Sequence, residues 1–106
     1  MDNNEKMLTL MTRLERKTTF QLLKEFRNDT NPPLEDVYFI AEIDLKPPVL
    51  NTLLYYVFLI NNGKLDKPLI KKIANQWKLM GIETISEAML AAKVRNKVAK
   101  KRFDTA

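Results

Sequence analysis

Apolar residues recur about every three to four positions along most of this chain, and polar stretches interrupt the pattern. This period is typical of helices that bury one face, and the alternation that indicates strands is absent. The segments with this period lie at about 4–17, 18–28, 34–43, 47–62, 67–80 and 84–103. The pattern predicts an all-α fold, a compact bundle of about five to six helices.

One segment differs from the others because it is apolar on every side. The run LLYYVFLI (Leu53–Ile60) follows the prolines at 47 and 48. A helix without a polar face is usually enclosed by other helices, so this one is predicted to be the central helix. In the first three segments the residues expected to point inward are Met7, Leu8, Leu10, Met11, Leu14, Phe20, Leu23, Phe26, Val37, Ile40 and either Tyr38 or Phe39. Those expected to be exposed are Glu35, Asp36 and Glu42.

Capping residues predict where several helices begin and end. The expected N-caps are Thr18, Asp66 and Thr84, and the first and last have glutamine or glutamate three residues later, as in a capping box. The expected stops are Gly63 and Gly81, because glycine accepts the left-handed backbone that ends many helices.

The composition excludes several classes of chemistry. The chain has no cysteine and no histidine, which rules out disulfides, zinc fingers and histidine-dependent nucleophiles. Phosphate-binding glycine motifs are also absent, since the two glycines stand alone. The adjacent acids Glu35 and Asp36 diverge on a helix, which disfavours a carboxylate nuclease site. We therefore expect a non-enzymatic protein without cofactor or metal.

The charge is unevenly distributed along the chain. Residues 1–44 contain nine acids and six bases, a net of −3, whereas residues 45–106 contain four acids and twelve bases, a net of +8. A basic half indicates a polyanionic partner such as nucleic acid, although basic ends also serve solubility.

The helix expected at 67–80 combines an apolar stripe with lysines. Leu69, Ile73, Trp77 and Met80 make the stripe, and Trp77 is expected mainly as a core anchor. The alternative is an exposed ring edge on which bases stack. We name as the first basic cluster Lys64, Lys67, Lys71, Lys72 and Lys78.

The last helix is expected to pack through Ile85, Ala88, Met89, Ala92, Ala99 and Phe103. We name as the second basic cluster Lys93, Arg95, Lys97, Lys100, Lys101 and Arg102. A solvated tail would explain this cluster, but two basic clusters on successive helices favour phosphate contact. Such contacts give salt-sensitive affinity with little sequence readout.

The stretch LKPPVLNTLLYYVFLINNGKLDKPLIKKIANQWKLMGIETISEAM resembles the second homology domain shared by the DnaD and DnaB primosomal proteins of Gram-positive bacteria. The resemblance runs from about residue 18 to 97 and is closer to the DnaB replication initiation and membrane attachment branch, a helicase co-loader. Its family signature is Tyr-x-x-x-Ile-x-x-x-Trp, matched here by Ile73 and Trp77, with Leu69 in place of the tyrosine. A tyrosine contact to DNA is therefore not expected.

The resemblance implies DNA binding with a single-strand component, oligomeric scaffolding through a separate N-terminal domain, and partners such as a helicase loader and DnaD-like proteins. It implies a cytoplasmic, nucleoid-associated module of a larger, membrane-associated protein, and no transmembrane segment is expected within this chain. The expected units are an N-terminal helix at 1–17 and the DNA-binding domain at 18–106. Two alternatives stay open: a phage replisome organiser with the same domain, and a protein-docking module. The docking surface would be Glu35, Asp36 and Glu42, or exposed Tyr38, Tyr55 or Tyr56.

Overall fold

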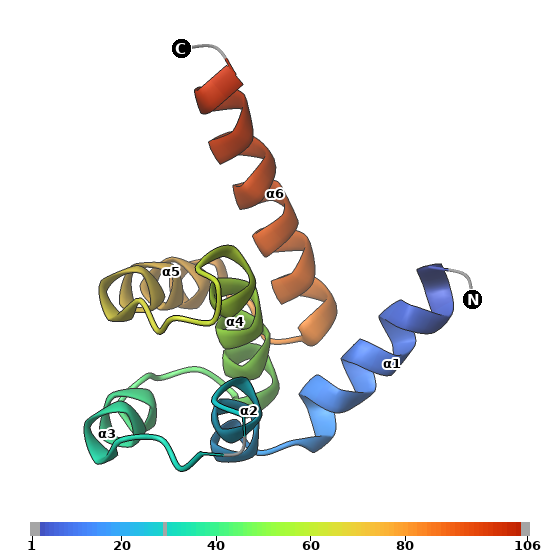
Figure 1. The fold of residues 1–106 in the computed structure, drawn as a ribbon. Helices are drawn as coiled ribbons and strands as arrows, with labels where there is room; N and C mark the ends of the chain where they lie inside the picture. Colours follow the sequence, from blue (N-terminus) through green and yellow to red (C-terminus); the bar gives the residue numbers. More distant parts are fainter. Residues whose placement is uncertain (1–2, 29, 105–106) are drawn as a thin grey trace.

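The computed structural model describes the backbone of residues 3–28 and 30–104, and the side chains of residues 6–28 and 30–96. This part of the chain is all-helical and compact, as the sequence predicts (Figure 1). The helices are α1 (Asn3–Arg16), α2 (Thr19–Phe26), α3 (Leu34–Ala41), α4 (Pro47–Ile60), α5 (Lys67–Met80) and α6 (Ile85–Asp104).

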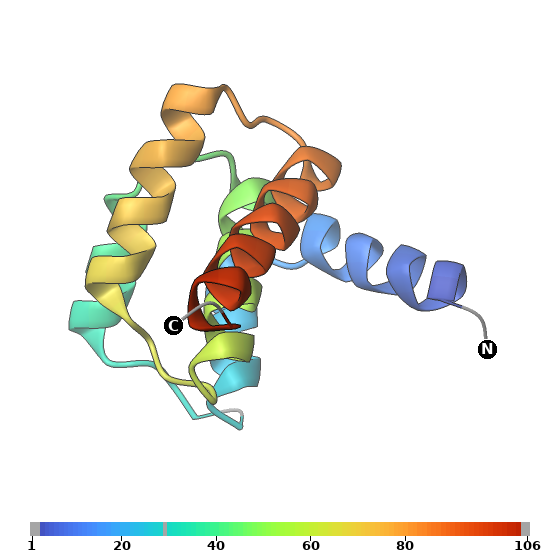
Figure 2. The same ribbon diagram turned by 90° about the horizontal axis from the view of Figure 1, so that it is seen from above.

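Helix α4 is the centre of the molecule, and α1, α2, α5 and α6 all pack against it (Figures 1 and 2). Leu53, Leu54 and Val57 are fully buried, which confirms the prediction of a central helix. Its last turn is different, because Leu59 and Ile60 are exposed rather than enclosed. The apolar run therefore extends past the core.

The predicted helix boundaries depend on side-chain caps that are present in the structure. Thr18 forms the capping box with Gln21, and the Asp66 carboxylate accepts a hydrogen bond from the Leu69 backbone N–H at 3.1 Å. Gly81 ends α5 in the left-handed conformation, with φ of 72°. Helix α4 ends at Ile60, earlier than expected, and the turn that follows brings Gly63 to φ of 80°.

A second capping box precedes α6. The Glu87 backbone N–H donates to the Thr84 hydroxyl, and the Glu87 carboxylate accepts from the backbone N–H of Thr84, at 3.1 Å each. The same carboxylate also accepts from the Glu83 backbone N–H at 3.2 Å. These hydrogen bonds lower the pKa of Glu87 below its ordinary value, with the Glu83 contact as the largest cause.

Four apolar residues expected inside are exposed instead: Met7, Leu8, Phe20 and Met80. In α1 the buried anchor is Leu14, near its C-terminal end, and the first turns extend away from the bundle (Figure 1). In α2 the buried residues are Leu22 and Leu23, which puts Phe20 on the outer side. The period in these segments is correct, but it does not show how far a neighbouring helix reaches.

Asn51 is the main polar residue of the core and was not singled out by the sequence. It is fully buried on α4, and its amide nitrogen donates to the backbone carbonyls of Leu14 at 3.0 Å and Lys17 at 2.8 Å. Its amide oxygen accepts from the Thr19 hydroxyl at 2.8 Å. Asn51 therefore satisfies carbonyls at the C-terminus of α1, which have no partner within the helix, and fixes the junction with α2. The expected division of the chain at residue 18 stays a prediction.

Candidate nucleic-acid interface

The apolar stripe of α5 packs into the core as predicted except at Met80, which is exposed. Ile73 is fully buried and Trp77 is 2% exposed, while Leu69 is half-buried. Trp77 is therefore a core anchor, and the alternative of an exposed stacking ring is wrong for this structure. The stripe orients α5, and it decides which way each lysine of the first basic cluster points.

Two of these lysines form ion pairs with acids on the α3 side of the molecule. Lys67 lies 3.0 Å from the Asp36 carboxylate, and Lys78 pairs with Asp44, in the loop after α3. Asp36 is 5% exposed and also accepts a hydrogen bond from Arg27 at 2.9 Å, so the expectation that it is exposed is wrong. A carboxylate at this depth needs charged partners, and these two bases supply them.

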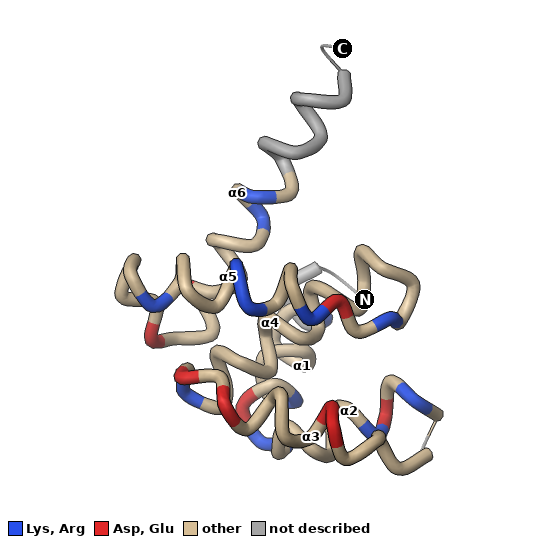
Figure 3. Tube along the Cα trace, turned by 90° about the vertical axis from the view of Figure 1, so that its left-hand side faces the viewer, with Lys and Arg blue, Asp and Glu red and all other residues tan. Residues whose placement is uncertain are grey.

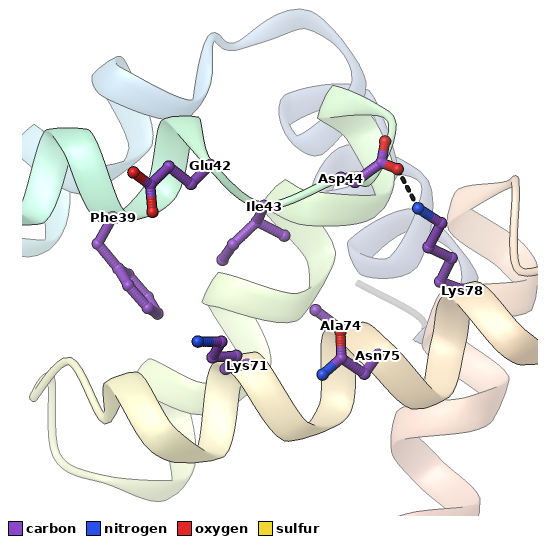
Figure 4. A pocket seen from close by; sticks show the side chains of 8 residues that line it. All are labelled: Phe39, Glu42, Ile43, Asp44, Lys71, Ala74, Asn75 and Lys78. Carbon is purple, nitrogen blue, oxygen red and sulfur yellow. Dashed lines mark hydrogen bonds and ion pairs between the residues drawn. The ribbon is translucent and has the colours of Figure 1, made fainter.

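A hollow of ≈ 200 Å³ separates α3 from α5 between these two ion pairs. Lys71 lies on its α5 side and Glu42 on its α3 side (Figure 4). The two ion pairs and the hollow thus put Lys67, Lys71 and Lys78 on the side of α5 that faces α3. Figure 3 shows basic positions along α5 beside acidic positions along α3 and the loop after it. Much of the positive charge on this side of α5 is compensated within the protein.

Lys72 lies on a different side of α5, toward α6. It is exposed, and it precedes Gln76 by one helical turn. The Gln76 side-chain oxygen accepts a hydrogen bond from the Arg95 guanidinium at 2.9 Å. This contact joins α5 to α6 and places members of both basic clusters beside each other. Among the described residues, no acid pairs with Lys72 or Arg95.

The positive charge of Arg95 acts on the hydroxyl of Tyr56 in α4. Burial raises the pKa of the Tyr56 hydroxyl above its ordinary value of 10.0, and the Arg95 guanidinium opposes that shift. Lys93 is exposed on the opposite side of α6, toward α1. Lys93 and Arg95 therefore lie on different surfaces of α6, although the sequence analysis put them in one cluster.

The remaining predicted residues fall in two groups. Lys64 is exposed in the loop before α5 and lines an open hollow together with Arg27 and Lys67. The side chains of the second group lie outside the described residues, and its members are Lys97, Lys100, Lys101 and Arg102. Gln76 is a residue that sequence reasoning missed, and no signal in the sequence marks a glutamine that will meet an arginine from the next helix.

The acidic surface predicted for protein docking is not present as one surface. Glu35 and Glu42 are exposed and Asp36 is buried, so the three acids do not form one surface. Tyr38 is exposed, whereas Tyr55 and Tyr56 are half-buried.

Neither a membrane-spanning helix nor a metal site is found among the residues that the structure describes. None of the described helices is long and apolar enough to cross a membrane. Within the same residues, no group of three or more acidic, histidine or cysteine side chains is placed to hold a metal ion.

Comparison with known families gives one match and comparison with solved structures gives none. The sequence profile of the family described as replication initiation and membrane attachment matches residues 4–92. The match begins within α1 and includes the whole of α2 to α5 and the first part of α6. The chain therefore belongs to the replication initiation and membrane attachment family, with a role related to DNA replication.

Proposed function

We propose that this domain is a non-enzymatic DNA-binding module that holds single-stranded DNA through its phosphates during replication initiation. The observation that supports the proposal is the contact between Gln76 and Arg95. Gln76 follows Lys72 by one helical turn and holds Arg95, and neither base has an acidic partner among the described residues. Free bases on adjacent helices suit a polyanion whose charges repeat along its length.

The lysines that face α3 have a smaller part in this proposal. A phosphate that approaches Lys67 or Lys78 must compete with Asp36 or Asp44. The contact to Asp36 also stabilises a buried carboxylate, so its loss would be costly. The core of the proposed phosphate surface is therefore Lys72 and Arg95. The bases after residue 96 stay candidates by sequence, since their side chains lie outside the described residues.

The proposal also includes the partners and the role that the resemblance implies. By the resemblance, the expected partners are a helicase loader and DnaD-like primosomal proteins, and the expected role is helicase loading. DNA contact through phosphates alone would suit that role, because a loader must act on strands of many sequences.

The test compares two double variants that remove the same charge. Lys72→Gln with Arg95→Gln removes the proposed contacts, and Lys24→Gln with Lys46→Gln is the matched control. Lys46 pairs with Glu83 on the exposed surface, a contact of about 0–1 kcal/mol, so the control should fold normally. Binding to a fluorescent single-stranded oligonucleotide would be followed by anisotropy at low salt.

We expect the first double variant to bind about tenfold more weakly and the control to bind like the parent. An equal loss in both variants would mean that only overall charge matters. Absence of binding by the parent chain at low salt would contradict the proposed function.

A further inference from the structure

An apolar groove lies between α1, α4 and α6. Its volume is ≈ 250 Å³. The residues that make its walls and floor are Leu10 and Leu14 of α1, Tyr56 and Leu59 of α4, and Met89 and Ala92 of α6. In Figure 1 α1 and α6 diverge as they extend away from α4.

The groove is part of the folded structure and does not depend on a loop. Leu14 and Ala92 are buried in the core, which fixes one end of each wall. The hydrogen bonds from Asn51 to the last carbonyls of α1 fix the direction in which that helix leaves α4. Both walls are therefore set in place before any partner arrives, which lowers the entropic cost of binding.

Apolar side chains in and beside the groove remain in contact with water. Leu59 lines the groove and is 62% exposed. Met7 is 48% exposed and lies one to two turns before Leu10 and Leu14 on the same side of α1. Together they extend the apolar surface from the floor along the α1 wall. A continuous exposed apolar surface with this shape is typical of a binding site.

The charge around the groove has one sign. Its lining contains no acid, and its charged member is Lys93, beside Asn96 on the α6 wall. An occupant therefore meets apolar side chains on the floor and the Lys93 ammonium at the α6 edge.

We propose that this groove binds an acidic amphipathic helix of a partner protein. Such a helix would place leucine-like side chains, spaced three to four residues apart, against Leu59 and Met89. Its acidic face would lie toward Lys93, the charged residue of the lining. A polynucleotide fits less well, because the surface of the lining is mainly apolar and holds a single base, Lys93.

A second copy of this chain also fits less well. The exposed helix that it would offer is α1, whose three bases outnumber its two acids, so it provides no acidic face for Lys93. Lys72 and Arg95 are not among the residues that line the groove, so a partner helix would leave both bases available to DNA.

The test uses the whole chain and a designed peptide probe. The probe is a helix of about 18 residues, roughly 27 Å long, with leucines at helical spacing on one face and glutamates on the other. A second peptide has lysines in place of the glutamates. The variant is Leu59→Glu, which places a charge in the groove, and the matched control is Leu79→Glu, since Leu79 is 90% exposed on α5 and outside the groove. Folding of both variants would be verified by circular dichroism, and both sites are exposed enough to accept glutamate.

We expect the parent and Leu79→Glu to bind the acidic peptide, Leu59→Glu to bind it at least about tenfold more weakly, and the lysine peptide to bind poorly. Equal binding of the two peptides, equal binding by both variants, or no binding of the acidic peptide would overturn the proposal. A loss of oligonucleotide binding in Leu59→Glu alone would assign the groove to nucleic acid instead. Self-association of the parent that Leu59→Glu abolishes in sedimentation would assign it to a second copy. DNA binding by the parent is a separate measurement, so failure of either proposal leaves the other testable.

Discussion

Replacing Asn51 by alanine should destabilise the protein more than its small change in volume suggests. The amide makes three hydrogen bonds, to the carbonyls of Leu14 and Lys17 and from the hydroxyl of Thr19. A net contribution of about 0.5–1.5 kcal/mol for each bond gives a total of about 3 kcal/mol. The two carbonyls would be left near the core without the amide donor, which makes this a lower estimate.

The measurement is urea unfolding followed by the fluorescence of Trp77, the single tryptophan of the chain. In a separate thermal unfolding experiment, a loss of about 3 kcal/mol should lower the melting temperature by roughly 10–20 °C in a domain of this size. Asn75→Ala is the matched control, because Asn75 is exposed on α5 and alanine is the better helix former there. If Asn51→Ala unfolds within about 0.5 kcal/mol of the parent, Asn51 does not hold the junction of α1 and α2, and that reasoning is refuted.

Three further predictions concern the core, a cap and an ion pair. Trp77→Ala should cost about 3–5 kcal/mol of unfolding free energy, because the ring is 2% exposed, and calorimetry that finds an unchanged melting temperature would contradict its role as core anchor. Because the folded pKa of Glu87 is lowered, its cap should contribute stability above the ordinary pKa of 4.5 and lose it as the pH falls through the folded value. In urea titrations at several pH values, the stability difference between the parent and Glu87→Gln should therefore shrink below pH 4.5, and a constant difference would count against this account. Asp36→Ala should destabilise the fold by about 3 kcal/mol, because Arg27 and Lys67 both lose their carboxylate partner. Glu35→Ala removes an exposed acid and should have little effect. Similar urea midpoints for the two variants would contradict a stabilising role of the buried Asp36 carboxylate.

The elements of this fold were predictable because their signals are local. A capping box needs residues only three positions apart, as in Thr18 with Gln21, and a left-handed stop needs one glycine. The central position of α4 was predictable because a helix without a polar face has few other places to lie. Trp77 followed from its spacing with Ile73 on the same helix face.

The rest depends on contacts between segments far apart in the chain. Asn51 reads as an interruption of an apolar helix, and only the position of α1 gives its amide three partners. Asp36 looks like an exposed acid until α2 and α5 bring Arg27 and Lys67 to it. The basic clusters were visible as composition, but their division among an α3 side, an α6 surface and a groove edge depends on how each helix is rotated about its axis.

The central claim is that Lys72 and Arg95 contact phosphates, and the salt dependence of binding tests it most directly. The logarithm of the affinity for single-stranded DNA falls with the logarithm of salt concentration, with a slope of about −0.7 for each phosphate contacted. Removing both bases should therefore make the slope of the parent less steep by about 1.4, while the control with Lys24 and Lys46 replaced should keep the slope of the parent. A double variant whose slope equals that of the parent would show that these two bases do not contact DNA.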